Sequence, residues 1–285
     1  AYWKEEYIDG GGARLKNPDQ VLRRLVAIND KVFVTLGLFA PVSMLDAATG
    51  EVLKTFEGTE NTFEILSDKG KLYVAVNSAL KRTGPDPNIS IMAVDIDSGK
   101  TLWQNKGYKG IWQTRSLAPQ YVDANLTLGK EGLFFIDGEE IVALDLNTGA
   151  NKWSVKRYDD SAASRSKKAS AKETGSGYSV LTYFDSILFY STYAKGNTAP
   201  LLAFAADSGK NLWVRMANSI ACNTSPDIFV NRGLVWMLNT STWTYEGLEP
   251  LTGVKRKTLN MSLIDSGTHH NCYKNKATQD FFLYG

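Results

Sequence analysis

The chain has 285 residues, of which 43% are hydrophobic, 22% charged and 11% aromatic, and it contains 2 cysteines. This composition excludes a disordered chain, a collagen and a disulfide-dense miniprotein. The net charge of +2 gives no overall attraction to nucleic acid or to an acidic membrane, so neither partner is expected. No apolar run approaches the roughly 18 residues that a transmembrane helix needs, so no transmembrane segment is expected.

Residues 1–20 precede the first apolar run and are expected to form an N-terminal arm or an outer strand. Short apolar runs separated by polar turns follow along the rest of the chain, which predicts short β-strands. The first unit has runs at 25–28, 32–36, 42–45 and 52–56. The next two units begin with the runs 63–66 and 71–76, and 122–128 and 133–136. Four antiparallel strands are therefore expected in each unit.

The second half of each unit carries a recurring motif. AVDIDSGKTLW (93–103) recurs as ALDLNTGANKW (143–153) and AFAADSGKNLW (203–213), with weaker copies at 44–54 and 247–257. A Ser/Thr-Gly turn between two apolar runs predicts a hairpin with glycine at positive φ. The tryptophans are expected to be buried at junctions between units rather than to stack on a cofactor. The structural residues assigned to the repeat are Asp46, Gly50, Asp95, Gly99, Trp103, Asp145, Gly149, Trp153, Gly209, Trp213 and Gly253.

Repeats of about 40–50 residues with four short strands are typical of propeller blades. We therefore predict an all-β fold, a β-propeller of four-stranded antiparallel blades, over residues 21–285. Because an open propeller leaves unpaired strand edges, the chain is expected to be part of a propeller of six to eight blades. The expected blades lie at about 21–58, 59–106, 121–156, 178–216 and 225–259, with a partial sixth blade at 273–285.

These motifs resemble the PQQ-like repeats of the quinoprotein alcohol dehydrogenase-like β-propellers over about residues 20–285. The segment THHNCYKNKAT (268–278) is also similar to one in secreted bacterial PQQ-like proteins of unassigned function. The resemblance implies a periplasmic or secreted protein of the bacterial envelope. It covers PQQ-dependent dehydrogenases, cofactor-free assembly lipoproteins of the outer membrane and many uncharacterised proteins, so the fold alone does not decide the function.

The predicted connections are unequal on the two faces of the propeller. Long loops gathered on one face of a rigid scaffold are where function usually lies. We call this side the long-loop face; its expected loops are 77–89, 104–120, 156–177, 191–200, 215–226 and 260–272. The insert at 156–177 is polar and is expected to be mobile. Its basic residues leave an anionic partner open as an alternative to a solvated loop.

The candidate ligand-binding residues fall in these long loops. Trp112, Gln113 and Arg115 combine an aromatic ring with a guanidinium, which suits a stacked or bidentate contact, although a structural anchor at the rim explains them too. The chain's only histidines, His269 and His270, lie close to Cys272 and Lys274. The remaining candidate is Cys222. All are expected near the mouth of the central channel.

Cys222 and Cys272 are separated by one blade period and are a candidate disulfide in an exported protein. A partner elsewhere in a longer chain is equally compatible with the sequence. Adjacent histidines followed by a cysteine do not have the usual ligand spacing of a zinc site, so no metal site is predicted.

Two functions remain open from the sequence. The first is a non-enzymatic propeller that binds a protein or a small ligand through the long-loop face. The alternative is a PQQ-dependent dehydrogenase domain that oxidises an alcohol or a sugar. The resemblance would then imply PQQ on the propeller axis, a disulfide of two adjacent cysteines, and calcium held by Glu, Asn and Asp. The sequence has no adjacent cysteine pair, so no cofactor is predicted and PQQ with calcium stays the alternative.

Overall fold

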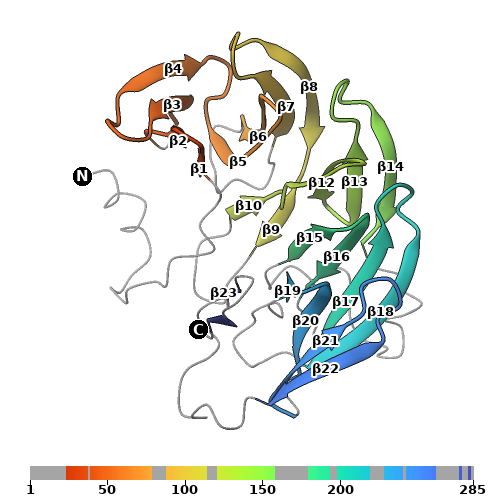
Figure 1. Ribbon diagram of the computed structural model, residues 1–285. Helices are drawn as coiled ribbons and strands as arrows, with labels where there is room; N and C mark the ends of the chain where they lie inside the picture. Colours follow the sequence, from red (N-terminus) through yellow and green to blue (C-terminus); the bar gives the residue numbers. More distant parts are fainter. Residues whose placement is uncertain are drawn as a thin grey trace, which may run out of the picture.

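The chain folds entirely into β-strands and turns within the residues that the computed structural model describes, which are 24–37, 39–78, 88–113, 121–157, 179–192, 198–218, 228–239, 242–260, 276–277 and 282–283. These strands form five four-stranded antiparallel sheets and two small two-stranded sheets. The sheets follow one another around an arc (Figure 1). The predicted all-β propeller is confirmed.

Each four-stranded sheet is one blade, with its strands side by side in chain order. Blade 1 consists of β1 (Leu25–Ile28), β2 (Lys31–Thr35), β3 (Val42–Asp46) and β4 (Val52–Phe56). Blade 2 consists of β5 (Thr62–Asp68), β6 (Lys71–Asn77), β7 (Ile89–Asp95) and β8 (Thr101–Tyr108). Blade 3 consists of β11 (Thr127–Gly129), β12 (Gly132–Asp137), β13 (Glu140–Leu144) and β14 (Asn151–Lys156). Blade 4 consists of β15 (Val180–Phe184), β16 (Ile187–Ser191), β17 (Thr198–Ala205) and β18 (Asn211–Asn218). Blade 5 consists of β19 (Ile228–Asn231), β20 (Leu234–Asn239), β21 (Thr244–Leu248) and β22 (Lys255–Asn260).

The first strand of each blade lies innermost. β1 contacts β5, β11 contacts β15, and β15 contacts β19, so the first strands of these neighbouring blades meet around one axis. The fourth strands β8, β14, β18 and β22 form the outer rim (Figure 1). After blade 5, β23 (Lys276–Ala277) pairs with β24 (Phe282–Leu283) and contacts β19, which is where the predicted partial sixth blade begins.

The first strand of blade 3 differs from the sequence prediction of one strand over residues 122–128. Residues 121–123 instead form β10 (Tyr121–Asp123), which pairs with β9 (Ile111–Gln113) in the connection from blade 2. Between β10 and β11, Asn125 has a φ of 52°, outside the extended region. The backbone N–H groups of residues 124–126 bond to the carboxylate of Glu64 instead of to a neighbouring strand. This bonding explains why the predicted strand is interrupted.

The hydrophobic core is a series of layers between adjacent blades. Alternate side chains of one strand enter different layers, as a β-strand requires. In β7, Met92 and Val94 pack towards blade 1, whereas Ile91 and Ala93 pack towards blade 3. The same holds in β16, where Leu188 faces blade 3 and its neighbours face blade 5. Blades 2 and 4 are therefore each held by the blades on both sides.

The corners between the third and fourth strands share a glycine turn, and in blades 1 to 3 an aspartate caps this turn. The repeat glycines have φ between 68° and 74°, a region that favours glycine. In blade 3, Asp145 Oδ1 accepts hydrogen bonds from the N–H groups of Asn147 and Thr148 and from the Thr148 hydroxyl, at 2.9–3.0 Å. Asp46 and Asp95 cap their corners in the same manner. The carboxylate thus satisfies N–H groups that the tight turn leaves without strand partners.

These carboxylate caps predict a loss of stability in acid. Bonds from the Thr49 N–H, the Ser98 hydroxyl and the Thr148 N–H are the largest causes that lower the pKa of Asp46, Asp95 and Asp145, respectively. The unfolded chain, with an ordinary aspartate pKa of 3.8, then binds more protons than the folded one. The contribution of these caps to the free energy of unfolding is complete above pH 3.8 and is lost as the pH falls through the lowered pKa values of the folded state.

We expect the triple variant Asp46→Asn/Asp95→Asn/Asp145→Asn to show a weaker pH dependence of stability below pH 3.8 than the native chain. Urea denaturation at a series of pH values from about 2 to about 7 measures the free energy of unfolding and checks this expectation. Asp207→Asn is the matched control, because Asp207 is exposed in the blade 4 corner, where Ala205 replaces the capping aspartate. If the free energy of unfolding of the triple variant fell below pH 3.8 as steeply as that of the native chain, the three aspartates would not be the cause of the acid dependence.

Neighbouring blades are joined by a side-chain donor on the outer strands of blades 1 to 4. The ring of Trp103 is buried, whereas Trp153 and Trp213 are half-buried, which corrects the expectation that all three are buried. All three rings lie on outer strands at the rim. Trp103 is a buried member of its core layer, whereas Trp153 and Trp213 pack against theirs as partly buried side chains. Each indole Nε1 donates to the carbonyl directly after the capping position of the next corner, and the pairs are Trp103 with Leu146 (3.2 Å), Trp153 with Ala206 (3.1 Å) and Trp213 with Pro250 (2.8 Å).

Blade 1 makes the same contact with a lysine. Lys54 occupies the motif position of the tryptophans, and its Nζ donates to the carbonyl of Ile96 at 3.0 Å and to that of Asp97. Ile96 directly follows the capping Asp95, so the acceptor is equivalent to that of the indoles. Blade 1 therefore keeps the hydrogen bond to this carbonyl, although it has no aromatic ring at this motif position.

Candidate functional site: the long-loop face

The two faces of the propeller carry different connections. On one face the chain reverses in two-residue turns at 29–30, 69–70, 130–131, 185–186 and 232–233 and in the five glycine corners. On the long-loop face, second strands lead to third strands and each blade leads to the next. Most of these connections are longer, although β12 leads to β13 through the two-residue turn 138–139. Long surface connections positioned by rigid sheets are suited to binding.

The structure places two of the predicted site residues. Trp112 and Gln113 lie in β9, opposite Val122 and Tyr121 of β10, so this connection contains a short hairpin rather than only a loop. The other candidates, Arg115, Cys222, His269, His270 and Lys274, lie outside the described residues. The same is true of Cys272, and hence of the Cys222–Cys272 disulfide, and of the insert from residue 158 to 178. Their grouping at the channel mouth stays a prediction.

The β9–β10 hairpin is attached to blade 3 through Asp137. The Asp137 Oδ1 atom accepts hydrogen bonds from the N–H groups of Lys109 (2.6 Å) and Gly110 (3.0 Å). The N–H of Gly138 in turn donates to the carbonyl of Gly110 at 2.7 Å. These three bonds fix the start of the hairpin at the end of β12, on the long-loop face.

A buried carboxylate holds the other end of the hairpin. Glu64, on the innermost strand of blade 2, is 3% exposed. Its Oε1 accepts from the N–H groups of Ala124 (3.3 Å) and Asn125 (2.9 Å), and its Oε2 from that of Leu126 (2.6 Å). A carboxylate can be buried when several donors compensate its charge. Glu64 therefore links the innermost strand of blade 2 to the segment between β10 and β11 that leads into blade 3.

We expect Glu64→Gln to lower the free energy of unfolding by about 1–3 kcal/mol, because a neutral amide gives weaker bonds and turns its own N–H groups towards these donors. Urea denaturation measures the loss, and amide hydrogen exchange should accelerate at residues 124–126. Glu60→Gln is the control, since Glu60 is exposed and lies nearby in the chain. Equal stability of the two variants would show that Glu64 has no such role.

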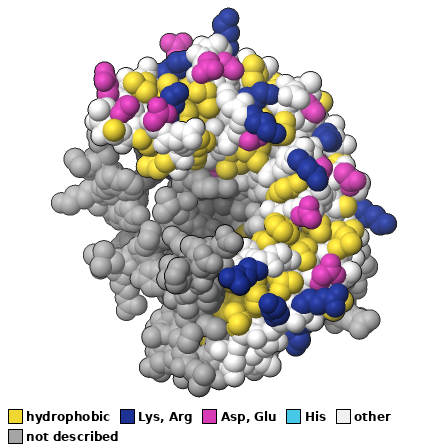
Figure 2. Space-filling view, viewed as in Figure 1, with side chains coloured by type: hydrophobic (Ala, Val, Ile, Leu, Met, Phe, Trp, Pro, Cys, Tyr) yellow, Lys and Arg dark blue, Asp and Glu magenta, His cyan; other side chains and the backbone are white. Residues whose placement is uncertain are grey.

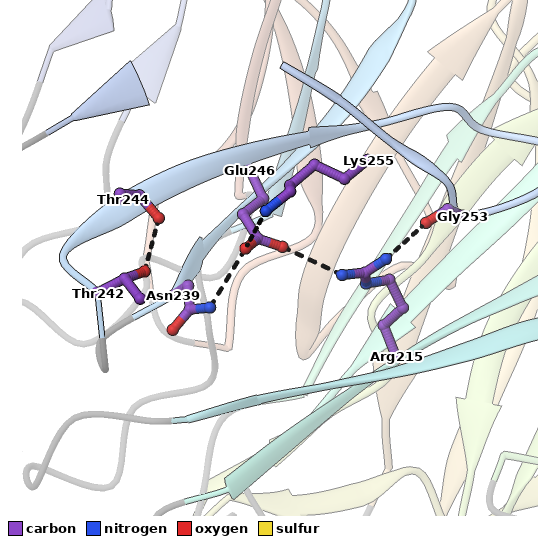
Figure 3. A network of polar contacts seen from close by, with 7 residues as sticks. All are labelled: Arg215, Asn239, Thr242, Thr244, Glu246, Gly253 and Lys255. Carbon is purple, nitrogen blue, oxygen red and sulfur yellow. Dashed lines mark hydrogen bonds and ion pairs between the residues drawn. The ribbon is translucent and has the colours of Figure 1, made fainter. Parts of the chain in front are cut away.

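A second buried carboxylate, Glu246 of β21, joins blades 4 and 5 (Figure 3). Its Oε2 atom lies 3.2 Å from Nη2 of Arg215 on β18, and its Oε1 atom lies 3.4 Å from Nζ of Lys255. Asn239 donates to the same Oε1 at 3.3 Å. Arg215 also donates to the carbonyl of Gly253 at 3.0 Å. Arg215 thus has a carboxylate partner, which it shares with Lys255, and it acts as a structural link between the two blades.

A third polar group lies between blades 3 and 4, where β14 and β16 end. Arg157, directly after β14, is 9% exposed, and its Nη1 donates to the Tyr190 hydroxyl at 2.9 Å. That hydroxyl lies 3.2 Å from Oγ of Ser179, which donates to Oγ1 of Thr192 at 3.1 Å. Ser179, Tyr190 and Thr192 are all buried. We call these four residues the Arg157 cluster.

The sequence reasoning missed these buried polar groups. Arg157 was assigned to the solvated insert, which is wrong, because it is buried against blade 4. The sequence did contain an indication that Arg157 is buried. Alternate residues of a strand share one side, and Arg157 follows Trp153 and Val155 on the inward side of β14. Glu64 and Glu246 gave no comparable signal, because the donors to Glu64 come from the connection into blade 3 and Arg215, a partner of Glu246, comes from blade 4.

Exposed apolar side chains and basic side chains lie on different parts of the described surface. Near the long-loop face, Leu36, Phe39 and Trp243 are 60%, 59% and 37% exposed. Every charged residue within the five outer strands is basic, and Figure 2 shows Lys and Arg side chains along this rim. The described surface thus offers aromatic contacts on one face and positive charge around the edge.

Within the described residues, no group of three His, Cys, Asp or Glu side chains is placed to hold a metal ion. The same part of the chain contains no helix that could span a membrane.

Comparison with known proteins identifies the family. The family model described as outer membrane protein assembly factor BamB matches residues 12–227, more than half of the chain. The chain belongs to this family of PQQ-like repeat proteins. A search of curated proteins finds no significant match.

Solved propellers resemble this family member in fold. The quinohemoprotein alcohol dehydrogenase of Comamonas testosteroni is 16% identical, with a TM-score of 0.53 over 86% of this chain and 44% of its own. The enzyme ADHIIG of Pseudomonas putida HK5 is 12% identical, with a TM-score of 0.53 over 83% of this chain and 41% of its own. The WD40 domain of Toxoplasma gondii coronin is 10% identical, with a TM-score of 0.54 over 82% and 57%. The chain thus spans about half the length of these structures, and at such identities the likeness concerns the fold alone.

Proposed function

We propose that this protein is a non-enzymatic β-propeller of the bacterial envelope, periplasmic or secreted, that binds a protein partner through its long-loop face. The observation that carries the proposal is the asymmetry of the two faces. One has tight corners, of which those in blades 1 to 3 are capped by aspartate. The other has the interblade connections, of which the one from blade 2 to blade 3 is anchored by Asp137 and Glu64. Exposed aromatic side chains such as Phe39 and Trp243 suit a protein interface. The family description, an outer membrane assembly factor, supports a protein partner and an envelope location.

Site-specific photo-crosslinking tests the proposal in cells that make the protein. A photoreactive phenylalanine analogue at Phe39 or Trp243 should give a discrete crosslinked partner. The matched positions are Ala48 and Leu251, in the corners of the same two blades on the opposite face. Leu251 is 59% exposed, so it controls for general stickiness of an apolar site. Crosslinks only from the corner positions would refute the proposed surface.

We also propose that the protein works without PQQ. Within the described residues, no group of three His, Cys, Asp or Glu side chains supports a site for the accompanying calcium. The chain's two cysteines are far apart in sequence, so they cannot form a disulfide of adjacent residues. We expect no dye-linked oxidation of alcohols or sugars after incubation with PQQ and Ca²⁺, and no quinone absorbance after gel filtration. Activity that depends on added PQQ would overturn this proposal.

A further inference from the structure

Arg157 is a buried cation whose position is set by the blade itself. Its backbone N–H donates to the carbonyl of Glu139 at 2.9 Å, so it extends the edge of blade 3 beyond β14. Its side chain follows Trp153 and Val155 on the inward side of the strand and is 9% exposed. Arginine keeps its charge in proteins, so burial cannot be relieved by loss of a proton.

Within the described residues, the hydrogen-bond acceptor of this guanidinium is neutral. Its partner is the Tyr190 hydroxyl, and the hydroxyls of Ser179 and Thr192 continue the chain of hydrogen bonds. Thr192 accepts from Ser179, which leaves the Thr192 hydroxyl proton to donate elsewhere. No ion pair within the described part of the chain involves Arg157.

The neighbouring blade interface provides an internal comparison. Arg215 joins blades 4 and 5 as Arg157 joins blades 3 and 4. The Arg215 side chain is 36% exposed, yet it has the Glu246 carboxylate at 3.2 Å. Arg157 is more buried and has no such counter-charge among the described residues. Buried charges are normally paired, because burial removes the water that would otherwise compensate them.

We propose that the Arg157 cluster is a binding site for a small oxyanion, either a carboxylate or a phosphate. A guanidinium has several N–H donors in a planar fork that matches both groups, and hydroxyls complete such a site. The cluster lies at the long-loop face, and the adjacent β14 carries only the basic charges of Lys152 and Lys156. The site goes beyond the proposed function, since a small ion binds the purified chain whether or not a protein partner exists.

Thermal unfolding of the full chain tests the site. Sodium phosphate, sodium acetate and sodium chloride are compared at equal ionic strength, so that general salt effects cancel. We expect phosphate or acetate to raise the Tm above the chloride value, and the stronger of the two names the preferred oxyanion. Arg157→Gln should weaken the affinity measured by calorimetry at least about tenfold, because charge-assisted hydrogen bonds are lost.

Arg215→Gln is the matched control, because it removes an interblade arginine that already has a carboxylate partner. It should lower the Tm without oxyanion and leave the response to the oxyanion unchanged. If neither anion raises the Tm of the native chain above chloride, or if Arg157→Gln responds as the native chain does, the proposal is wrong. Should Arg157→Gln not fold, Thr192→Val replaces it, since it removes one hydroxyl donor at similar volume. An affinity unchanged in Thr192→Val would then overturn the site.

Discussion

Replacing Trp103 with alanine is expected to lower the free energy of unfolding by about 3–5 kcal/mol. Trp103 is 8% exposed and belongs to the core layer between blades 2 and 3. Its ring lies 6.2 Å from that of Tyr73, and its Nε1 donates to the Leu146 carbonyl. The substitution therefore creates a cavity and also removes the indole donor of the Leu146 carbonyl, which keeps only the longer bond from the Tyr73 hydroxyl at 3.4 Å. Urea denaturation followed by circular dichroism measures the loss.

Leu102→Ala is the control for Trp103→Ala. Leu102 is the preceding residue on β8 and is 44% exposed, so its truncation should alter stability by only about 0.5 kcal/mol. Trp103→Lys is informative as well, because Lys54 makes the equivalent contact in blade 1. We expect it to be more stable than Trp103→Ala. If Trp103→Ala and Leu102→Ala were equally stable, the ring would not hold the two blades together.

The second large effect is expected for Gly149→Ala, which should cost about 2–5 kcal/mol from backbone strain and overpacking together. Gly149 has a φ of 71°, where an L-residue is strained. A Cβ atom at this position would also lie 2.7 Å from Cδ2 and Cε3 of the Trp103 ring. The ring is held by its own bond to Leu146, so it cannot move away without losing that contact.

Gly99→Ala separates the two contributions. Gly99 has nearly the same φ, 74°, but a Cβ there meets only Cδ of the flexible Lys54 at 3.7 Å. Its cost should therefore be backbone strain alone, about 1–2 kcal/mol. In a Trp103→Ala background, the cost of Gly149→Ala should fall to that of Gly99→Ala, because the ring is gone. Additive effects of Trp103→Ala and Gly149→Ala would contradict the close contact.

Much of the fold could be predicted from local sequence. Turn glycines recur at a blade-length interval, with a tryptophan at a fixed distance after each of three of them, and this pattern indicates propeller blades. The prediction succeeded because the hairpin corner depends on residues within a few positions: a capping carboxylate, a hydroxyl and a glycine at positive φ. The Lys54 copy was visible as a departure from the motif. Only the structure showed that Lys54 donates to the equivalent carbonyl.

The candidate site was much less predictable. The strand expected over 122–128 is interrupted because Glu64, in another blade, captures the N–H groups that the strand would have used. No local pattern contains that information. Arg157 looked like one more basic residue of a polar insert, yet it turns inward at the end of β14. Chemistry at blade interfaces joins residues far apart in sequence, as Arg215 and Glu246 also show.

The sequence by itself determined the repeat unit, the all-β class and the unequal lengths of connections, since turn chemistry and alternating hydrophobicity act over a few residues. The tertiary structure alone decided which charges are buried and what compensates them. Glu64 and Glu246 obtain donors from neighbouring blades, whereas the partner of Arg157 among the described residues is the neutral hydroxyl of Tyr190. The physical reason is that burial and electrostatic pairing depend on the packing of one blade against the next, which a single strand's sequence does not specify.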